Sequence, residues 1–128
     1  MEFTEQFEGW LEQAFASEVS SDVKAFSFNL FEPAFVDGVK FGVEVVGSSE
    51  FDPGNADWAC EEIWSPKQRQ LNIPVAFSGE TWEQCLEAIK SVGVTTLGKH
   101  SREAACLKSR LGVGVGFVDG DMHVVWQP

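Results

Sequence analysis

The sequence predicts an α+β domain in which one mostly antiparallel sheet of about five strands carries its helices on one face. Apolar and polar residues alternate over residues 24–32 and 39–46, which is the period of half-buried strands. Residues 4–16 and 81–92 have helical spacing instead, and an Asp-Gly pair joins two apolar runs near the C-terminus. We therefore expect the order α-β-β-β-α-α-β-β in a single domain spanning residues 1–128.

The first element is predicted to be an amphipathic helix over residues 4–16, with Thr4 as its N-cap. Its apolar residues recur at the i, i+3, i+4 and i+7 spacing of one helical face. They are Phe7, Trp10, Leu11, Ala14 and Phe15. We expect this face to pack against the sheet.

Three strands follow the helix in the predicted order. Residues 24–32 and 39–46 place their apolar side chains on one side of the sheet, because successive strand residues point to opposite faces. These side chains are Phe26, Phe28, Leu30, Val39, Phe41, Val43 and Val45. Residues 58–64 are the predicted third strand, and residues 65–74, which lie between two prolines, are a predicted loop.

Two helices are predicted next. Thr81 and Gln84 form the capping box of a helix over residues 81–92, for which Gly93 is the expected stop. The apolar positions of this helix are Trp82, Cys85, Leu86, Ile89 and Val92. Ser101 is the predicted N-cap of a second helix over residues 101–110.

The C-terminal residues predict a hairpin with Asp119 and Gly120 as the two residues of a type I′ turn. This register pairs Phe117 with Met122 and Val113 with Trp126. The opposite face then holds Gly112, Gly114, Gly116, His123 and Val125. Glycines in a strand predict that a helix or another part of the backbone approaches closely there.

The net charge narrows the class of partner. The chain has 20 acidic and 9 basic residues and a formal charge of -11 at pH 7. This balance disfavours nucleic acid and anionic membranes, and it favours a basic protein partner. Residues 1–64 contain 14 of the acidic residues but only two basic ones, Lys24 and Lys40.

No set of residues has the spacing of a catalytic or cofactor site, so we expect a non-enzymatic protein without a cofactor or metal. The glycines near the C-terminus follow a helix and enter a hairpin, whereas phosphate-binding glycines lie between a strand and a helix. Cys60, Cys85 and Cys106 are odd in number and lack a C-x-x-C motif, which favours a reducing cytoplasm. No apolar run reaches the length of a membrane span, and no export signal is visible.

The first candidate site is an acidic set with an aromatic residue among the carboxylates. Its members are Glu50, Asp52, Asp57, Trp58, Glu61 and Glu62. Aromatic anchors with charge around them are typical of tight protein interfaces, so these are the predicted contacts with a basic partner. A solvated loop and strand edge explains the same residues without any function.

Asp121 and His123 form the alternative candidate site, for a small ligand or a metal ion on the C-terminal hairpin. They lie two residues apart and therefore on the same strand face. The chain has only one other histidine, His100, so a metal ion would need ligands from elsewhere. A third interpretation is a homo-oligomer formed through a sheet edge.

Three short segments of the chain are similar to segments of a known protein family. They are Phe28-Asn29-Leu30-Phe31-Glu32, the stretch from Phe51-Asp52 to Asp57-Trp58-Ala59-Cys60, and Gly116-Phe117-Val118-Asp119-Gly120-Asp121. These segments resemble small bacterial proteins of the immunity type, which occur in polymorphic toxin systems. The resemblance implies a non-enzymatic inhibitor that masks one toxin domain in the cytoplasm of the producing cell. It implies no particular contact residues, because such proteins diversify at their interfaces.

Overall fold

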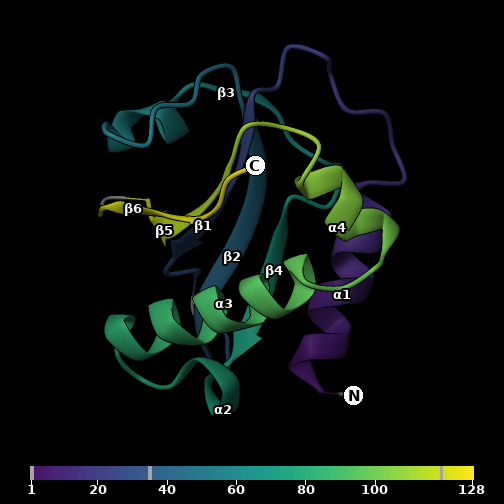
Figure 1. Ribbon diagram of the computed structural model, residues 1–128. Coiled ribbons are helices and arrows are strands. Elements are labelled where there is room, and N and C mark those ends of the chain that lie inside the picture. The colour runs from purple at the N-terminus through teal and green to yellow at the C-terminus, as the bar shows by residue number, and fades with distance from the viewer. Residues whose placement is uncertain (1, 35, 119) are drawn as a thin grey trace.

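The computed structural model describes residues 2–34, 36–118 and 120–128, and it contains a six-stranded mixed sheet with α-helices packed on it (Figure 1). The elements along the chain are α1 (Phe3–Ala14), β1 (Ala25–Phe31), β2 (Val39–Ser48), the 3-10 helix η1 (Ala56–Cys60), β3 (Glu62–Trp64), β4 (Gln70–Pro74), α2 (Val75–Ser78), α3 (Trp82–Leu97), α4 (Arg102–Leu107), β5 (Val113–Phe117) and β6 (Met122–Trp126). The α+β class is therefore confirmed.

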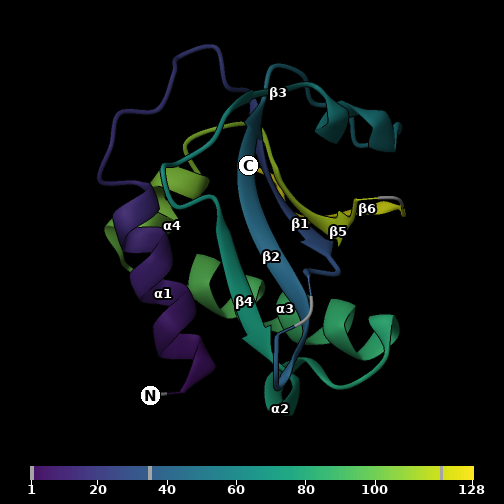
Figure 2. The ribbon, with the colours of Figure 1, turned by 180° about the vertical axis from the view of Figure 1, so that it is seen from behind.

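The sheet has the strand order β3-β2-β1-β5-β6, and β4 pairs with a different part of the long strand β2. β1 runs parallel to β5, while the other pairs are antiparallel, as the prediction of a mostly antiparallel sheet requires. Helices α1 and α4 lie on one side of the sheet, and η1 lies on the other side (Figures 1 and 2).

The core lies between the sheet and the apolar face of α1. Phe7 packs 5.5 Å from Phe28 between ring centroids, and Phe15 packs 5.2 Å from Phe26. All five apolar residues predicted for this helical face are buried. Each buried side chain of this size contributes about 1.5–3 kcal/mol, so this interface is a main source of stability.

The predicted start of α1 is wrong. Thr4 lies inside the first turn, and the N-cap position is Glu2, which makes no side-chain capping bond. Phe3 is buried, with its ring centroid 4.6 Å from that of Phe77. Packing of Phe3 therefore starts the helix two residues earlier than the capping preference predicts.

The predicted strand over residues 58–64 is also wrong in its first half. Asn55 accepts a hydrogen bond from the Asp57 N–H at 3.1 Å, and this local cap begins η1 in place of a strand. Of the predicted strand, only the last three residues, Glu62–Trp64, form a strand, which is β3. The predicted loop over residues 65–74 contains β4 instead, because Ile73 is buried in the core.

The third helix begins as predicted and ends later. The Gln84 N–H donates to Thr81 Oγ1 at 3.2 Å, and the Thr81 N–H donates to Gln84 Oε1 at 3.2 Å, which confirms the capping box. Gly93 is not the stop, because α3 continues to Leu97, which is buried. Burial of this last turn outweighs the roughly 1 kcal/mol that a glycine costs inside a helix.

The next helix begins at the predicted N-cap. Ser101 accepts the Ala104 N–H at 3.1 Å. α4 is shorter than predicted, because it ends at Leu107 rather than at Arg110.

The C-terminal hairpin forms in a register that differs from the prediction by one residue. Met122 faces Gly116 rather than Phe117, and Val124 faces Gly114. A side chain at position 116 has no room, since its Cβ would lie 3.1 Å from the Met122 Cα. The hairpin backbone therefore closes against this glycine.

A bulge after Val113 restores the predicted pairing of Val113 with Trp126. Between Gly116 and the bulge, the one-residue shift in register places His123 opposite Val115. His123 therefore lies on the helix-facing side of the sheet. The prediction that His123 shares the glycine face is therefore wrong. Asp119, the first residue of the predicted turn, lies outside the described residues.

Candidate functional site

The glycine face of the hairpin is covered by aromatic side chains from the loop before β3. A Cβ at Gly112 would lie within 3.1 Å of several atoms of the Phe51 ring, and one at Gly114 would lie 2.9 Å from Trp58 Cζ2. Phe51 and Trp58 also pack on each other, with ring centroids 5.0 Å apart. The glycines of this face are thus closely approached, but by aromatic side chains, so the prediction that a helix or another part of the backbone lies there is wrong for Gly112 and Gly114.

Only some residues of the predicted partner-binding set remain free on the surface. Trp58 is only 3% exposed, so it is not available as an anchor for another protein. Glu62 is paired with Arg69. Four exposed carboxylates remain, and we call them the acidic loop. They are Glu50, Asp52, Asp57 and Glu61.

A partly buried ion pair between Glu44 and Arg69 lies on the side of the sheet opposite the core helices. Glu44 is 9% exposed, and it accepts hydrogen bonds from Arg69 Nη2 at 3.1 Å and from Asn29 Nδ2 at 3.2 Å. Burial alone raises the pKa of Glu44, but the hydrogen bonds from Arg69 and Asn29 outweigh it and hold the pKa below its ordinary value. Hydrogen bonds to Glu62 and Glu44 raise the pKa of Arg69. The pair therefore links β2 to the segment before β4 and to β3.

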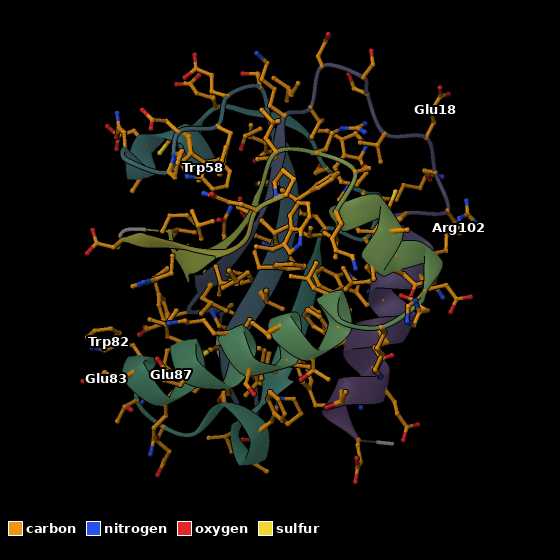
Figure 3. All side chains as sticks on the ribbon, viewed as in Figure 1. Glu18, Trp58, Trp82, Glu83, Glu87 and Arg102 are labelled. Atoms are coloured by element: carbon orange, nitrogen blue, oxygen red, sulfur yellow. The ribbon has the colours of Figure 1, made fainter. Side chains whose placement is uncertain are left out.

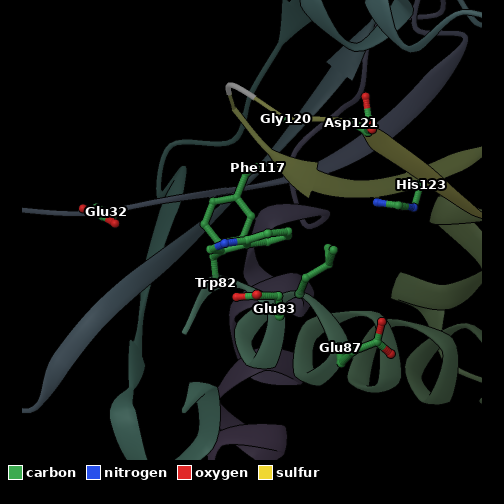
Figure 4. A pocket seen from close by; sticks show the side chains of 9 residues that line it. Glu32, Trp82, Glu83, Glu87, Phe117, Gly120, Asp121 and His123 are labelled. Atoms are coloured by element: carbon green, nitrogen blue, oxygen red, sulfur yellow. The ribbon is translucent and has the colours of Figure 1, made fainter. Parts of the chain in front are cut away.

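A groove of about 730 Å³ lies between the N-terminal half of α3 and the C-terminal hairpin (Figure 4). Its lining residues come from the residue after β1, from α3 and from the hairpin. They are Glu32, Trp82, Glu83, Leu86, Glu87, Phe117, Gly120, Asp121 and His123. The alternative site residues Asp121 and His123 are thus brought together in this groove.

Trp82 is exposed, although the sequence predicts that it lies on the apolar face of its helix. The helical spacing groups it with Cys85 and Ile89, which are buried, but Trp82 is 57% exposed at the first position of α3. Its ring centroid lies 6.3 Å from that of Phe117, edge to face. A large exposed aromatic beside a groove is a typical feature of a binding surface.

Acidic side chains surround this tryptophan. Glu32, Glu83, Glu87 and Asp121 line the groove, and among its described lining residues there is no lysine or arginine. Lys90 Nζ lies 3.6 Å from Glu87 Oε1 and is the one basic group paired with this rim in the described part of the chain. The groove therefore combines aromatic surface with an excess of negative charge, which suits a cationic group.

Metal binding gains no support from this arrangement. Within residues 2–34, 36–118 and 120–128, no three His, Cys, Asp or Glu side chains are placed to hold a metal ion. The three cysteines are free, and burial raises the pKa of the Cys85 thiol to about 12. Cys85 is thus a core residue, as expected, whereas Cys60 is exposed.

The acidic loop and the groove lie on opposite faces of the sheet, but both regions adjoin its edge strand β6. In Figures 1 and 2, η1, β6 and the start of α3 follow one another along one side of the molecule. Figure 3 shows Trp82, Glu83 and Glu87 on this side and Arg102 on the opposite side. We call the surface formed by the acidic loop and the groove the acidic side.

No family model, curated protein or solved structure matches this chain. Among the described residues, no helix is long and apolar enough to cross a membrane.

Proposed function

We propose that this chain is a non-enzymatic, cytoplasmic binding protein of the immunity type, which masks a basic toxin domain. One observation carries the proposal: two acidic regions far apart in the sequence, the acidic loop and the groove rim, gather on one side of the molecule. The net charge of -11 and the resemblance of three segments to immunity-type proteins support the same function.

The mechanism is steric occlusion assisted by charge. A surface of one sign attracts an oppositely charged partner over distances near the Debye length, about 8 Å at physiological salt, and raises the association rate. Rim charges then set orientation and specificity, while buried aromatic contacts supply most of the binding free energy. On the acidic side, the exposed carboxylates match the first role and Trp82 matches the second.

Affinity capture with matched charge variants tests this function. The variant Glu50→Lys/Asp57→Lys/Glu61→Lys reverses three charges of the acidic loop, while Glu12→Lys/Glu18→Lys/Asp22→Lys changes the net charge equally at exposed residues outside the acidic side. The wild type and the second variant are expected to capture one basic protein at low salt, and the first variant is expected to lose it. The captured protein should arrest growth when expressed alone, and co-expression of this chain should restore growth. Equal capture by both variants, or a captured protein that is harmless, contradicts the proposal.

The groove also favours a second candidate function, the binding of a small cationic ligand. Its volume of about 730 Å³ lies within the range of roughly 300–1,000 Å³ that is usual for ligand sites. A screen of thermal unfolding against amines and guanidines tests it, because a ligand at 100 times its Kd adds about 2.7 kcal/mol of stability. No change in Tm with any compound contradicts this second candidate.

A further inference from the structure

We infer that the groove between α3 and the C-terminal hairpin binds an arginine side chain of the partner, with its guanidinium stacked on Trp82 and its N–H groups directed to the acidic rim. The inference rests on the proposed function and adds the residue type that the partner presents. It also assigns the groove a role separate from that of the acidic loop.

The position of Trp82 supports stacking. The capping box of Thr81 and Gln84 fixes the first turn of α3, and Phe117 supports the indole from the hairpin. Phe117 is held in turn by Phe41, at 5.6 Å between centroids. The indole is therefore positioned before binding, while more than half of its surface faces solvent. Tryptophan is the aromatic side chain that attracts a cation most strongly within about 6 Å of its ring.

The acidic rim supports a cation with several donors. Glu32, Glu83 and Asp121 line the groove from the residue after β1, from α3 and from the hairpin, and none of them forms an ion pair with a described residue. A guanidinium presents five N–H donors in one plane, so it can stack on an indole and donate to carboxylates at its edge at the same time. An ammonium group is compact and more strongly hydrated. This chemistry favours arginine over lysine.

The size and walls of the groove fit an arginine within a chain. About 730 Å³ is far more than one side chain fills, so the flanking residues of a peptide can enter as well. Leu86 adds apolar surface to the lining, beside the exposed ring of Trp82 on the same helix. The methylene stem of arginine packs well on such a surface while its charged end stays at the rim.

Three blocked tripeptides provide the test: acetyl-Gly-Arg-Gly-amide, the same peptide with lysine, and the same peptide with citrulline. Citrulline keeps the shape of arginine without its charge. Binding is followed by the NMR signals of the tryptophan indole N–H groups in the intact chain, with the Trp82 signal assigned through Trp82→Phe. The arginine peptide is expected to shift the Trp82 signal. The signal of Trp10, whose indole N–H donates to the Gln68 carbonyl at 2.7 Å, should stay in place and serve as an internal control.

Two variants make the test specific to the groove. In Trp82→Ala the indole reporter is absent, so binding to this variant is followed by the backbone N–H signals of the hairpin. This variant is expected to bind the arginine peptide about two- to thirty-fold more weakly, the range of a cation–π contact. Glu83→Gln/Asp121→Asn removes two rim charges at exposed positions without changing shape, and it should also weaken binding. Equal binding of the citrulline or lysine peptide, or an arginine effect that survives in both variants, would overturn the inference.

The same variants separate this inference from the proposed function. If a basic partner is captured but its affinity is the same for the wild type and Trp82→Ala, the arginine assignment is wrong and the proposed function stands. If the arginine peptide binds the groove and no basic protein is captured, the arginine chemistry of the groove is supported and the proposed function is wrong.

Discussion

Trp58 and Trp82 both lie among acidic residues, yet the fold uses them in opposite ways. Trp58 is 3% exposed and packs on Gly114, whereas Trp82 is 57% exposed and lies at the edge of an acidic groove. The neighbouring charges in the sequence do not distinguish the two residues. The difference comes from the surface that each residue faces. A strand of alternating glycines gives Trp58 a site to fill, whereas the described residues around Trp82 leave it 57% exposed.

The largest expected difference between the two regions is in stability. Trp58→Ala removes a buried indole, and this type of change typically lowers the free energy of unfolding by about 3–5 kcal/mol. Trp82→Ala changes an exposed residue, for which about 0.5 kcal/mol or less is typical. Urea denaturation of both variants measures this contrast. Equal losses would mean that the two tryptophans do not have separate roles.

A smaller effect is expected from filling the glycine face. A Cβ at Gly114 would lie 2.8 Å from Met122 Sδ and 2.9 Å from Trp58 Cζ2, so Gly114→Ala should cost about 1–3 kcal/mol through overpacking. Gly9→Ala is the matched control, because Gly9 is exposed in α1 and nothing lies within 4 Å of its Cβ position. The control should gain up to about 1 kcal/mol from helix propensity. A Gly114→Ala protein as stable as the wild type would show that the aromatic cover is loosely packed.

The ion pair between Glu44 and Arg69 should have an effect that depends on pH. Arg69→Ala leaves Glu44 buried without its main partner, which we expect to cost about 1–2 kcal/mol at neutral pH, a value reduced for the partial exposure of Arg69. The folded-state pKa of Glu44 lies below its ordinary value of 4.5, so its contribution is present at neutral pH and is lost as the pH falls through the folded-state pKa. The difference between wild type and variant should therefore shrink below about pH 4.5 in denaturation series. A difference independent of pH would place the effect of Arg69 in packing rather than in charge.

Much of the fold follows from local patterns in the sequence. The apolar face of α1, the strands β1 and β2 and the capping box at Thr81 each depend on residues close in the chain, and each is confirmed. The two strands are buried on both faces, however, rather than half-buried as predicted. The errors occur where contacts between distant residues decide the outcome. Gly93 does not end α3, because burial of the last turn outweighs the local cost of the glycine.

The candidate site was less predictable for the same reason. Asp121 and His123 were singled out correctly as neighbours, and the structure places both in the groove. Their meeting with Trp82 depends on the one-residue shift of the hairpin, in which Met122 faces Gly116. For Trp58 the glycines of β5 predicted a close neighbour but not which residue of the chain would supply it.

The affinity of the captured partner for wild-type protein and for Trp82→Ala tests the central claim most directly. Calorimetry at moderate salt would give both Kd values, with Tm measured alongside. The account predicts an unchanged Tm and a Kd at least about 30-fold weaker for Trp82→Ala, the loss of about 2 kcal/mol that defines a central interface residue. An unchanged Kd would show that the groove is not part of the interface and would contradict the account.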